Sequence, residues 1–199
     1  MKSPLRKRIP RELKGEFGKY LVVFLLMVLT IGFVSGFLVA DGSMLKAYDE
    51  SFDKYNIENG NFRTAEKVYR SQWKDIEAAG VKLYENYYIE EALDNGSTMR
   101  FFKNREQGNK GCLMKGEMPS GQGEIAIDRM YADNNSLQVG DTLTRGKKFW
   151  KITGLVALSD YSALFQNNND SMFDSVKFGV GIVTPEEFET LDQEKLQYN

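Results

Sequence analysis

The sequence predicts an α+β protein with one N-terminal transmembrane helix followed by an extracytoplasmic domain of mixed α-helices and β-strands. Residues 20–40 contain no charged side chain, the residues before them are strongly basic, and residues 41–199 mix helical and strand periodicities. We therefore expect three parts: a cytoplasmic basic elbow segment over residues 1–19, a transmembrane helix over residues 20–40, and an extracytoplasmic core domain over residues 41–199.

The apolar segment 20–40 is the strongest signal in the chain. At a rise of about 1.5 Å per residue, a helix of this length reaches roughly 30 Å, the thickness of a bilayer's hydrocarbon core. Residues 1–19 hold seven basic and two acidic side chains, a formal charge of +5, and Asp41 opens the other flank. The positive-inside rule then predicts a single-pass protein of the cell membrane, with a cytoplasmic N-terminus and an extracytoplasmic C-terminal domain.

A cleaved signal peptide is the alternative interpretation, because it also combines a basic start with an apolar stretch. The apolar run is longer than the usual ~7–15-residue core of a signal peptide. The tripeptide 38–40 begins with a large leucine where cleavage needs a small residue, and the more suitable tripeptide 34–36 lies inside the apolar run. These features favour an uncleaved anchor.

Small residues recur every four positions in the transmembrane segment, at Gly32, Gly36 and Ala40. This spacing places them on one helix face, where another transmembrane helix can approach closely. We expect this helix-packing face to contact other transmembrane segments. The alternative is composition alone, because glycine is common in membrane helices.

The basic segment 7–21 has two compatible roles. Ile9, Leu13 and Phe17 are spaced four apart, so a helix here would lay an apolar face in the headgroups of the inner leaflet. Its basic side chains also serve as the orientation signal. Residues 20–199 carry the remaining formal charge of −7, which argues against a nucleic-acid partner.

Periodicity and capping signals divide the exported part into short elements. An apolar stripe from Met44 to Tyr55 predicts a helix that continues the span outward, with a bend available at Gly42. Asn95-Gly96 predicts a short hairpin turn, because both residues tolerate positive φ. The other expected elements are a helix over 69–79 closed by Gly80, strands over 81–93, 98–103, 123–128, 147–158 and 175–184 (with Val176, Phe178, Val180 and Ile182 on one face), a helix over 129–135 capped by Asp128, and a terminal helix opened by Thr184, Pro185 and the capping-box Glu187.

The composition excludes several kinds of catalysis. The chain has no histidine and one cysteine, Cys112, which removes Ser/His/Asp and Cys/His catalysis, imidazole-bound zinc and an intrachain disulfide. Neither GxxxxGK[ST] nor GxGxxG occurs, so no nucleotide-binding motif is present. We expect a protein that is not an enzyme, with no catalytic residue, no cofactor and no metal site.

Two pairs of acidic residues suggest carboxylate catalysis at first sight. In the pair Glu90-Glu91, strand neighbours point to opposite faces, so the two carboxylates cannot work together. The pair Glu186-Glu187 is explained by helix capping. Both pairs are expected on the solvent-exposed surface.

Two further clusters have simple structural interpretations. Residues 167–170 with Asp174 lack the glycine and terminal glutamate of a calcium loop, so a polar surface loop is expected. Aromatic residues gather around the hairpin and are expected in the core, with a peptide- or sugar-binding platform as the alternative. They are Tyr84, Tyr87, Tyr88, Phe101 and Phe102.

Three blocks follow one another in the second half: GEIAI at 123–127, LQVGDTL at 137–143 and GKKFWKITG at 146–154. With the head RKRIPRELKGEFGKYLVVFLLMVLTIGFVSGF, they resemble the amino-terminal part of FtsX-like, MacB-type ABC transporter permeases. In that family a GE(I/V)xI strand, a short helix, LxVGDxL and a GKxxxxxVxG strand follow one another in the periplasmic core domain. From the residues alone, Gly140-Asp141 is a turn pair, and Leu137, Val139 and Leu143 pack inward in a β scaffold without chemistry.

The resemblance implies a MacB-like periplasmic core domain and a non-catalytic subunit or fragment of a permease. Its partners would be the lipid bilayer, other permease transmembrane segments and a separate cytoplasmic ATP-binding subunit. Family permeases continue through further spans, so a chain ending at Asn199 resembles a truncated gene product, a split subunit or an excised fragment. The alternative function is a membrane-anchored extracellular binding module without a transport partner, and an exported hydrolase ranks third.

Overall fold

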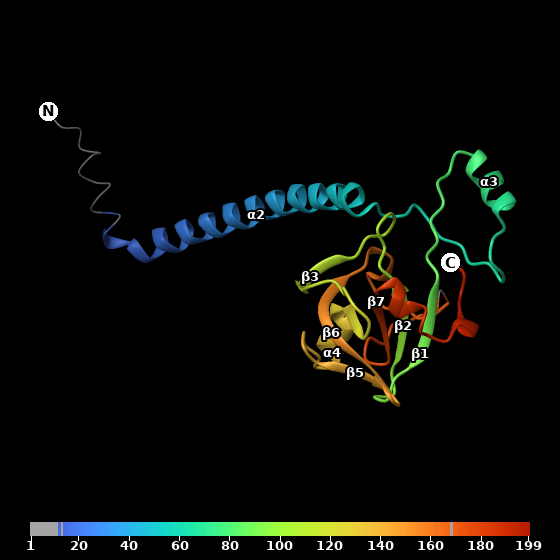
Figure 1. Ribbon diagram of the computed structural model, residues 1–199. Coiled ribbons are helices and arrows are strands. Elements are labelled where there is room, and N and C mark those ends of the chain that lie inside the picture. Colours follow the sequence, from blue (N-terminus) through green and yellow to red (C-terminus); the bar gives the residue numbers. More distant parts are fainter. Residues whose placement is uncertain (1–11, 13, 168) are drawn as a thin grey trace. The chain divides into compact units, whose positions relative to one another are not determined.

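The computed structural model describes residues 12, 14–167 and 169–199 (Figure 1). It separates the chain into two compact units, residues 1–50 and 51–199. An apolar N-terminal helix followed by a domain with a mixed sheet confirms the coarse α+β prediction. Ile9 and Leu13, on which the predicted amphipathic face of the basic segment depends, lie outside the described residues.

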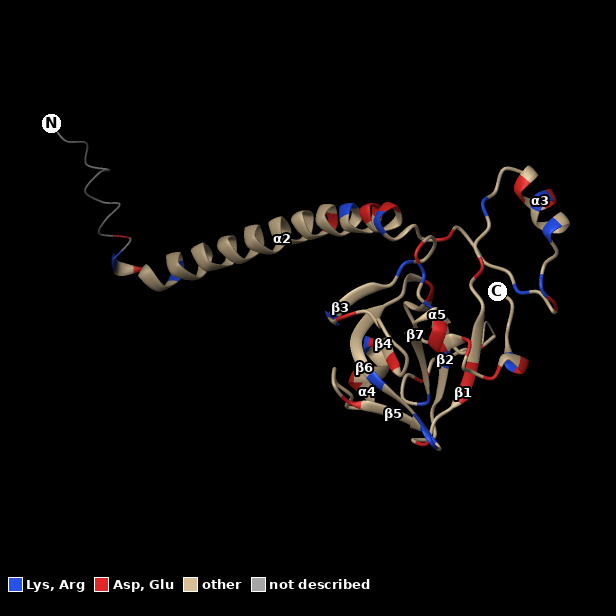
Figure 2. Ribbon diagram, in the orientation of Figure 1, with Lys and Arg blue, Asp and Glu red and all other residues tan. Residues whose placement is uncertain are grey.

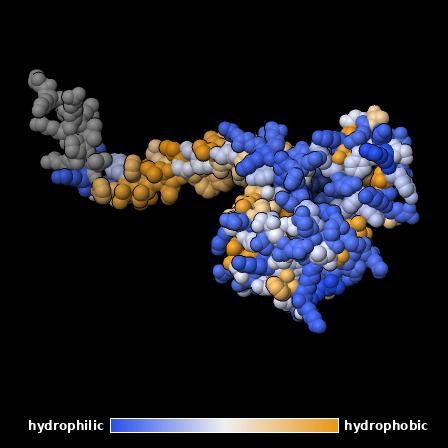
Figure 3. All heavy atoms as spheres, viewed as in Figure 1, coloured by the Kyte–Doolittle hydropathy of each residue, from blue (hydrophilic) through white to orange (hydrophobic). Residues whose placement is uncertain are grey.

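Helix α2 (Phe17–Tyr55) is one continuous helix of 39 residues. It has no break at Gly42, so the predicted continuation of the helix beyond the apolar segment is confirmed and the optional bend is absent. No residue of α2 is buried, and Figure 3 shows hydrophobic side chains on the surface of its apolar part and hydrophilic side chains towards its C-terminal end. Among the described residues it is the one helix long and apolar enough to cross a membrane, which is compatible with a single-pass membrane protein.

The second unit is built on a seven-stranded mixed sheet with the order β1-β2-β7-β4-β6-β3, in which β5 also pairs with β6. The pairs β2/β7 and β4/β6 are parallel, and the remaining pairs are antiparallel. The strands are β1 (Tyr88–Ala92), β2 (Thr98–Lys103), β3 (Cys112–Gly116), β4 (Glu124–Asp128), β5 (Thr142–Arg145), β6 (Lys148–Ala157) and β7 (Phe178–Val183). The helices are α3 (Arg70–Ala78), α4 (Arg129–Asn134), α5 (Pro185–Phe188) and the 3-10 turns η1 (Ser159–Tyr161) and η2 (Gln193–Lys195).

Both faces of the central strand β7 are covered, and all six of its residues are buried. On one face Gly179 lies under the ring of Tyr131 from α4, where an added Cβ would come within 2.6 Å of the ring. Two predicted inward positions are wrong: Val176 precedes the strand and is 51% exposed, and Val139 is 36% exposed. Leu143 is buried as expected.

The β1–β2 hairpin differs from its prediction at the turn. The amide of Leu93 donates to the carbonyl of Ser97 at 2.8 Å, and the amide of Gly96 donates to the carbonyl of Leu93 at 3.0 Å. Only Gly96 has positive φ (+81°), whereas Asn95 stays outside the left-handed region. The connection is therefore a three-residue loop with glycine at the left-handed position.

The N-terminal caps of the short helices α4 and α5 agree in part with those predicted from the sequence. Asp128 caps α4 as predicted, its carboxylate accepting from the amides of Met130 at 2.8 Å and Tyr131 at 3.2 Å. Thr184 caps α5 by accepting from the amide of Glu187 at 3.2 Å. The expected return bond of the capping box is absent, because the Glu187 carboxylate is bound elsewhere in the domain.

Candidate functional site

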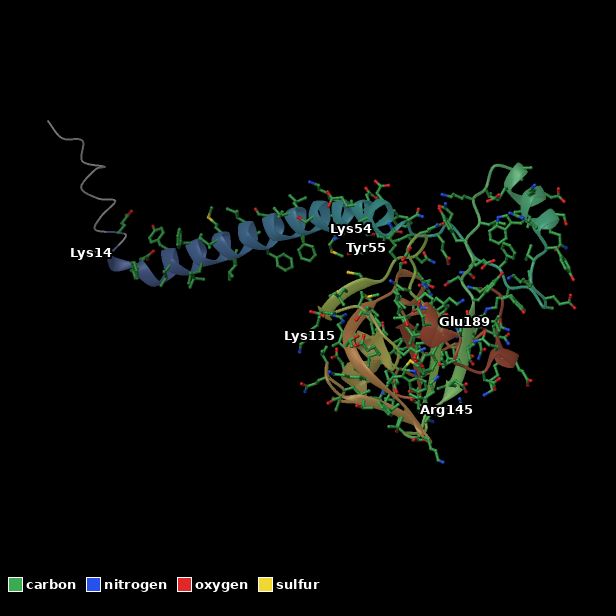
Figure 4. All side chains as sticks on the ribbon, in the orientation of Figure 1. Lys14, Lys54, Tyr55, Lys115, Arg145 and Glu189 are labelled. Carbon is green, nitrogen blue, oxygen red and sulfur yellow. The ribbon has the colours of Figure 1, made fainter. Side chains whose placement is uncertain are left out.

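The predicted helix-packing residues Gly32, Gly36 and Ala40 all lie in α2. A continuous helix aligns residues four apart, so the three small side chains share one face. A Cβ added at Gly32 or Gly36 would meet nothing within 4 Å, and side chains project outward all around the helix (Figure 4). The face is open, so another helix could approach it closely.

Charged residues border the apolar part of α2 without entering it (Figure 2). Lys19 and Asp41 are the nearest charges on the two sides. The ion pairs at these ends, Glu16–Lys19 at 3.0 Å and Lys46–Glu50 at 3.7 Å, are solvent-exposed and add little stability. The charge pattern therefore sets the limits of the apolar span and leaves its interior uncharged.

In the second unit, Arg100 is a buried cation in the sheet, with its side chain 2% exposed. Its Nε donates to Glu90 at 2.8 Å and its Nη1 to the hydroxyl of Tyr161 at 2.8 Å. The guanidinium carbon lies 4.2 Å from the ring centre of Tyr88 and 4.9 Å from that of Phe178. Burial acts to lower the pKa of Arg100, but Tyr161 and Glu90 raise it overall, so the group stays charged.

A second buried ion pair joins Arg105 and Asp160, whose side chains are 6% and 7% exposed. Nη1 of Arg105 lies 2.8 Å from each carboxylate oxygen, and the guanidinium stacks over Phe102 at 4.1 Å. Nε and Nη2 of Arg105 are buried without a hydrogen-bond partner. The pair neutralises Asp160, which lies in the 3-10 turn η1 after β6.

Two glutamates predicted on the surface are buried instead. Glu91 is fully buried and lies 2.7 Å from Arg145 and 2.9 Å from Lys195, and the hydrogen bond that Lys195 donates to the Glu91 carboxylate raises the pKa of Lys195. Glu187 is 4% exposed, while its neighbour Glu186 is exposed. The prediction that strand neighbours point apart is confirmed for Glu90-Glu91, but solvent exposure of both pairs was wrong because long-range partners neutralise the buried members.

Glu187 joins three parts of the domain. Its Oε2 accepts from the amide of Gly123 at 2.9 Å, and its Oε1 accepts from Trp150 Nε1 at 2.8 Å. Lys148 Nζ lies 2.9 Å from the same Oε1. Burial acts to raise the pKa of Glu187, but the donors from Gly123, Lys148 and Trp150 lower it overall.

The hairpin aromatics are mostly core residues, as predicted. Tyr88, Phe101 and Phe102 are at most 3% exposed, so they cannot form a binding platform. Tyr84 and Tyr87 are half-buried, and burial raises the pKa of Tyr87 to about 12. The alternative of a peptide- or sugar-binding platform is therefore wrong for Tyr88, Phe101 and Phe102, and of the five rings Tyr84 and Tyr87 alone keep part of their surface exposed.

The predicted polar loop 167–170 is exposed at its described positions, where Oδ2 of Asp170 accepts from the amide of Asn167 at 2.8 Å. Asp174 accepts from the amides of Val176 and Lys177. No group of three or more acidic or cysteine side chains that could hold a metal ion occurs in the described part of the chain. These acidic residues therefore have local turn partners.

A hollow of about 510 Å³ opens between the segment after α2 and the loop after β6. Its charged lining residues are Arg63, Arg100, Asp160 and Asp170, and Phe165 contributes an aromatic surface. Sequence reasoning missed it, because its walls come from four separate segments of the chain and none carries a motif. One sequence feature could have indicated the hollow: Arg100 is a charged residue between the apolar residues Met99 and Phe101 of a predicted strand.

No family model, no curated protein and no solved structure matches this chain. We therefore infer its function from its own residues. Two features remain for that inference: the open apolar helix α2 with its small-residue face, and the polar hollow of the sheet domain.

Proposed function

We propose that this chain is a non-catalytic membrane subunit or fragment of an ABC transporter permease of the FtsX-like, MacB-type class. Its domain outside the membrane would contact substrate or relay motion driven by a separate cytoplasmic ATP-binding subunit. The sequence blocks at 123–154 and the basic head support this assignment. The chain has no nucleotide-binding motif, so ATP would bind to the separate subunit. This chain would then provide the mechanical connection to the domain outside the membrane.

The single observation behind the proposal is the continuity of α2. The helix runs without a break from the apolar segment to Tyr55, and Tyr55 is bonded to Lys110, before β3, and to Cys112, the first residue of β3. The carbonyl of Tyr55 accepts from the amide of Lys110 at 2.9 Å, and its hydroxyl donates to Sγ of Cys112 at 3.0 Å. If the helix moves as one body with these contacts, it would transmit displacement to the domain, whereas a flexible tether would absorb it.

The proposed partners follow from the two ends of the span. The bilayer would surround the apolar surface of α2, and the face of Gly32, Gly36 and Ala40 would contact other permease helices. The basic head would remain in the cytoplasm near the ATP-binding subunit, and residues 41–199 would lie outside the cell membrane.

Substitution of the small residues tests this proposal. The double variant Gly32→Leu with Gly36→Leu should abolish co-purification with other membrane subunits in mild detergent, because bulk on this face separates the helix backbones. The matched control Val28→Leu keeps the span equally apolar and should retain partners. Insertion should survive in both variants. If the double variant retains every partner, the permease proposal fails.

Orientation is tested separately by cysteine labelling in a Cys112→Ser background. A membrane-impermeant thiol reagent added to intact cells should label Ser120→Cys, which lies at an exposed position, and should not label Ser3→Cys. A mature protein beginning near Phe37, or the reverse labelling pattern, would contradict the anchored orientation.

The polar hollow favours a second candidate, a membrane-anchored extracellular binding module without a transport partner. A concave site of this volume lies within the range of small-molecule sites, roughly 300–1,000 Å³. The two candidates differ in their partners. A binding module needs no second membrane subunit, so the wild-type chain would co-purify with none, and the double variant of Gly32 and Gly36 would show no loss.

A further inference from the structure

We propose that the hollow beside Arg63 binds a small zwitterion of the α-amino acid class with an apolar side chain. The ligand's carboxylate would meet Arg63, its ammonium would meet Asp170, and its side chain would lie against Phe165. This inference goes beyond the proposed function, because such binding requires neither an ATP-binding subunit nor other membrane helices.

The charge balance of the hollow selects a zwitterion. Arg100 is neutralised by Glu90, and Asp160 is neutralised by Arg105. Arg63 and Asp170 remain, and neither has an ion-pair partner among the described residues. Among the lining side chains, one free cation and one free anion match a ligand with both charges. A ligand with only one charge would leave either Arg63 or Asp170 unmatched.

Arg63 is positioned as the carboxylate-binding group. Its guanidinium carbon lies 5.3 Å from the ring centre of Tyr88, which orients the planar group without using its N–H donors. No residue in the described part of the chain hydrogen-bonds its side chain. A guanidinium with its donors free binds a carboxylate through two parallel hydrogen bonds, a geometry that a lysine ammonium does not offer.

One oxygen acceptor in the hollow is available to an ammonium group. Oδ2 of Asp170 accepts from Asn167, while Oδ1 of Asp170 has no partner among the described residues. An ammonium group that donates to Oδ1 would form a charge-assisted hydrogen bond with the Asp170 carboxylate.

The apolar part of the ligand has a surface to contact. Phe165 is 38% exposed in the hollow, and its ring packs edge-on against Phe173 at 5.8 Å, which holds it in place. Ala163 adds a second small apolar contact to the lining. An aromatic or branched aliphatic side chain would cover this surface, so phenylalanine and leucine are the appropriate probes.

Calorimetric titration of the full chain in lipid nanodiscs at pH 7 tests the proposal. L-phenylalanine and L-leucine should bind. L-phenylalaninamide, which lacks the carboxylate, and N-acetyl-L-phenylalanine, which lacks the ammonium, should each bind at least tenfold more weakly than L-phenylalanine. An absence of binding by both amino acids overturns the proposal. An amide or acetyl derivative that binds as tightly as the parent also overturns it.

Two exposed positions provide variants that should fold normally. Arg63→Gln should weaken L-phenylalanine at least tenfold, and the matched control Lys67→Gln, an exposed cation of the same segment outside the hollow, should leave binding unchanged. Asp170→Asn should weaken L-phenylalanine without changing the weak binding of N-acetyl-L-phenylalanine. Unchanged affinity in Arg63→Gln refutes the site. This outcome is independent of the co-purification that decides the permease proposal.

Discussion

Replacing Glu187 by glutamine removes a buried charge and keeps the size of the side chain. In the native domain its two oxygens accept from Gly123, Trp150 and Lys148, and Oε1 also accepts from the hydroxyl of Thr190 at 3.1 Å. These donors come from the start of β4, from β6 and from the turn after α5. The substitution therefore tests whether one carboxylate joins three parts of the domain.

The size of the effect follows from the positions of the donors. Glutamine has one acceptor oxygen and one NH₂ group, so either orientation of its amide sets a donor against the amide of Gly123 or against Trp150 Nε1. An unsatisfied buried donor costs about 1–3 kcal/mol, and the lost charge of the Lys148 bond adds to it, so we expect a destabilisation of roughly 2–4 kcal/mol.

The pH dependence provides a second measurement of the same interaction. The pKa of Glu187 is lower in the folded state than its ordinary value of 4.5, because the donors outweigh burial. The stability contributed by the ionised carboxylate is thus complete above pH 4.5 and is lost as the pH falls through the folded-state pKa. The stability gap between wild type and Glu187→Gln should therefore be constant near pH 7 and should narrow below pH 4.5.

Urea unfolding followed by the fluorescence of the buried Trp150, in a Trp73→Phe background, measures the effect on the full chain in detergent. The matched control Glu186→Gln changes an exposed neighbour and should leave the transition midpoint in place. If Glu187→Gln lies within about 0.5 kcal/mol of wild type at pH 7, the carboxylate does not join these elements.

Three further predictions concern the core and the domain boundary. Ile152→Asp places an unpaired charge at a fully buried position and should cost more than about 4 kcal/mol in urea unfolding, while Lys151→Asp next to it should fold. Gly179→Ala forces a methyl group against the ring of Tyr131 and should lower the melting temperature, by a destabilisation of about 1–3 kcal/mol; an unchanged melting temperature would mean that the ring moves freely. Residues 44–199 produced alone should be soluble, monomeric and cooperatively unfolding, and a melting curve that requires a metal ion or responds to nucleotide would contradict this expectation.

Helices whose signals lie close together in the chain were predictable from the sequence. The apolar run and the stripe up to Tyr55 gave α2, Asp128 gave the start of α4, and Gly80, with φ of +89°, follows α3 as expected. Each signal acts within one or two turns of chain, where capping and periodicity operate. Strand order could not be predicted, because β2 pairs with β7 and β4 with β6 across long separations in sequence.

The polar interior was not predictable for a related reason. Burial of a charge depends on the partner that neutralises it, and the partners of Glu91 and Asp160 are 54 or more positions away in the chain. Strand periodicity did indicate that Glu91 is buried, because Glu91 lies on the same strand face as Ile89 and Leu93, which are both buried. The hollow depends on the same long-range pairing, since Arg100 and Asp160 line it only after their own partners are in place.

The hairpin turn shows how tertiary contacts decided between two registers. A two-residue Asn95-Gly96 turn would set Arg100 opposite Glu91, whereas the three-residue loop sets it opposite Glu90. The longer loop leaves Asp94 free to accept from the amide of Gly146 at 3.0 Å.

Asn95 is likewise occupied in the three-residue loop, where its side-chain oxygen accepts from the amide of Ser97 at 3.0 Å and its Nδ2 donates to the hydroxyl of Tyr131 at 3.1 Å. The same register turns Glu91 to the opposite face of the sheet, where Arg145 and Lys195 neutralise it. The local preference for a tight turn was therefore outweighed by polar contacts that exist only in the assembled domain. Because that register also pairs Arg100 with Glu90, the turn indirectly affects the charge of the hollow, in which the side chains of Arg63 and Asp170 have no ion-pair partner within the described part of the chain.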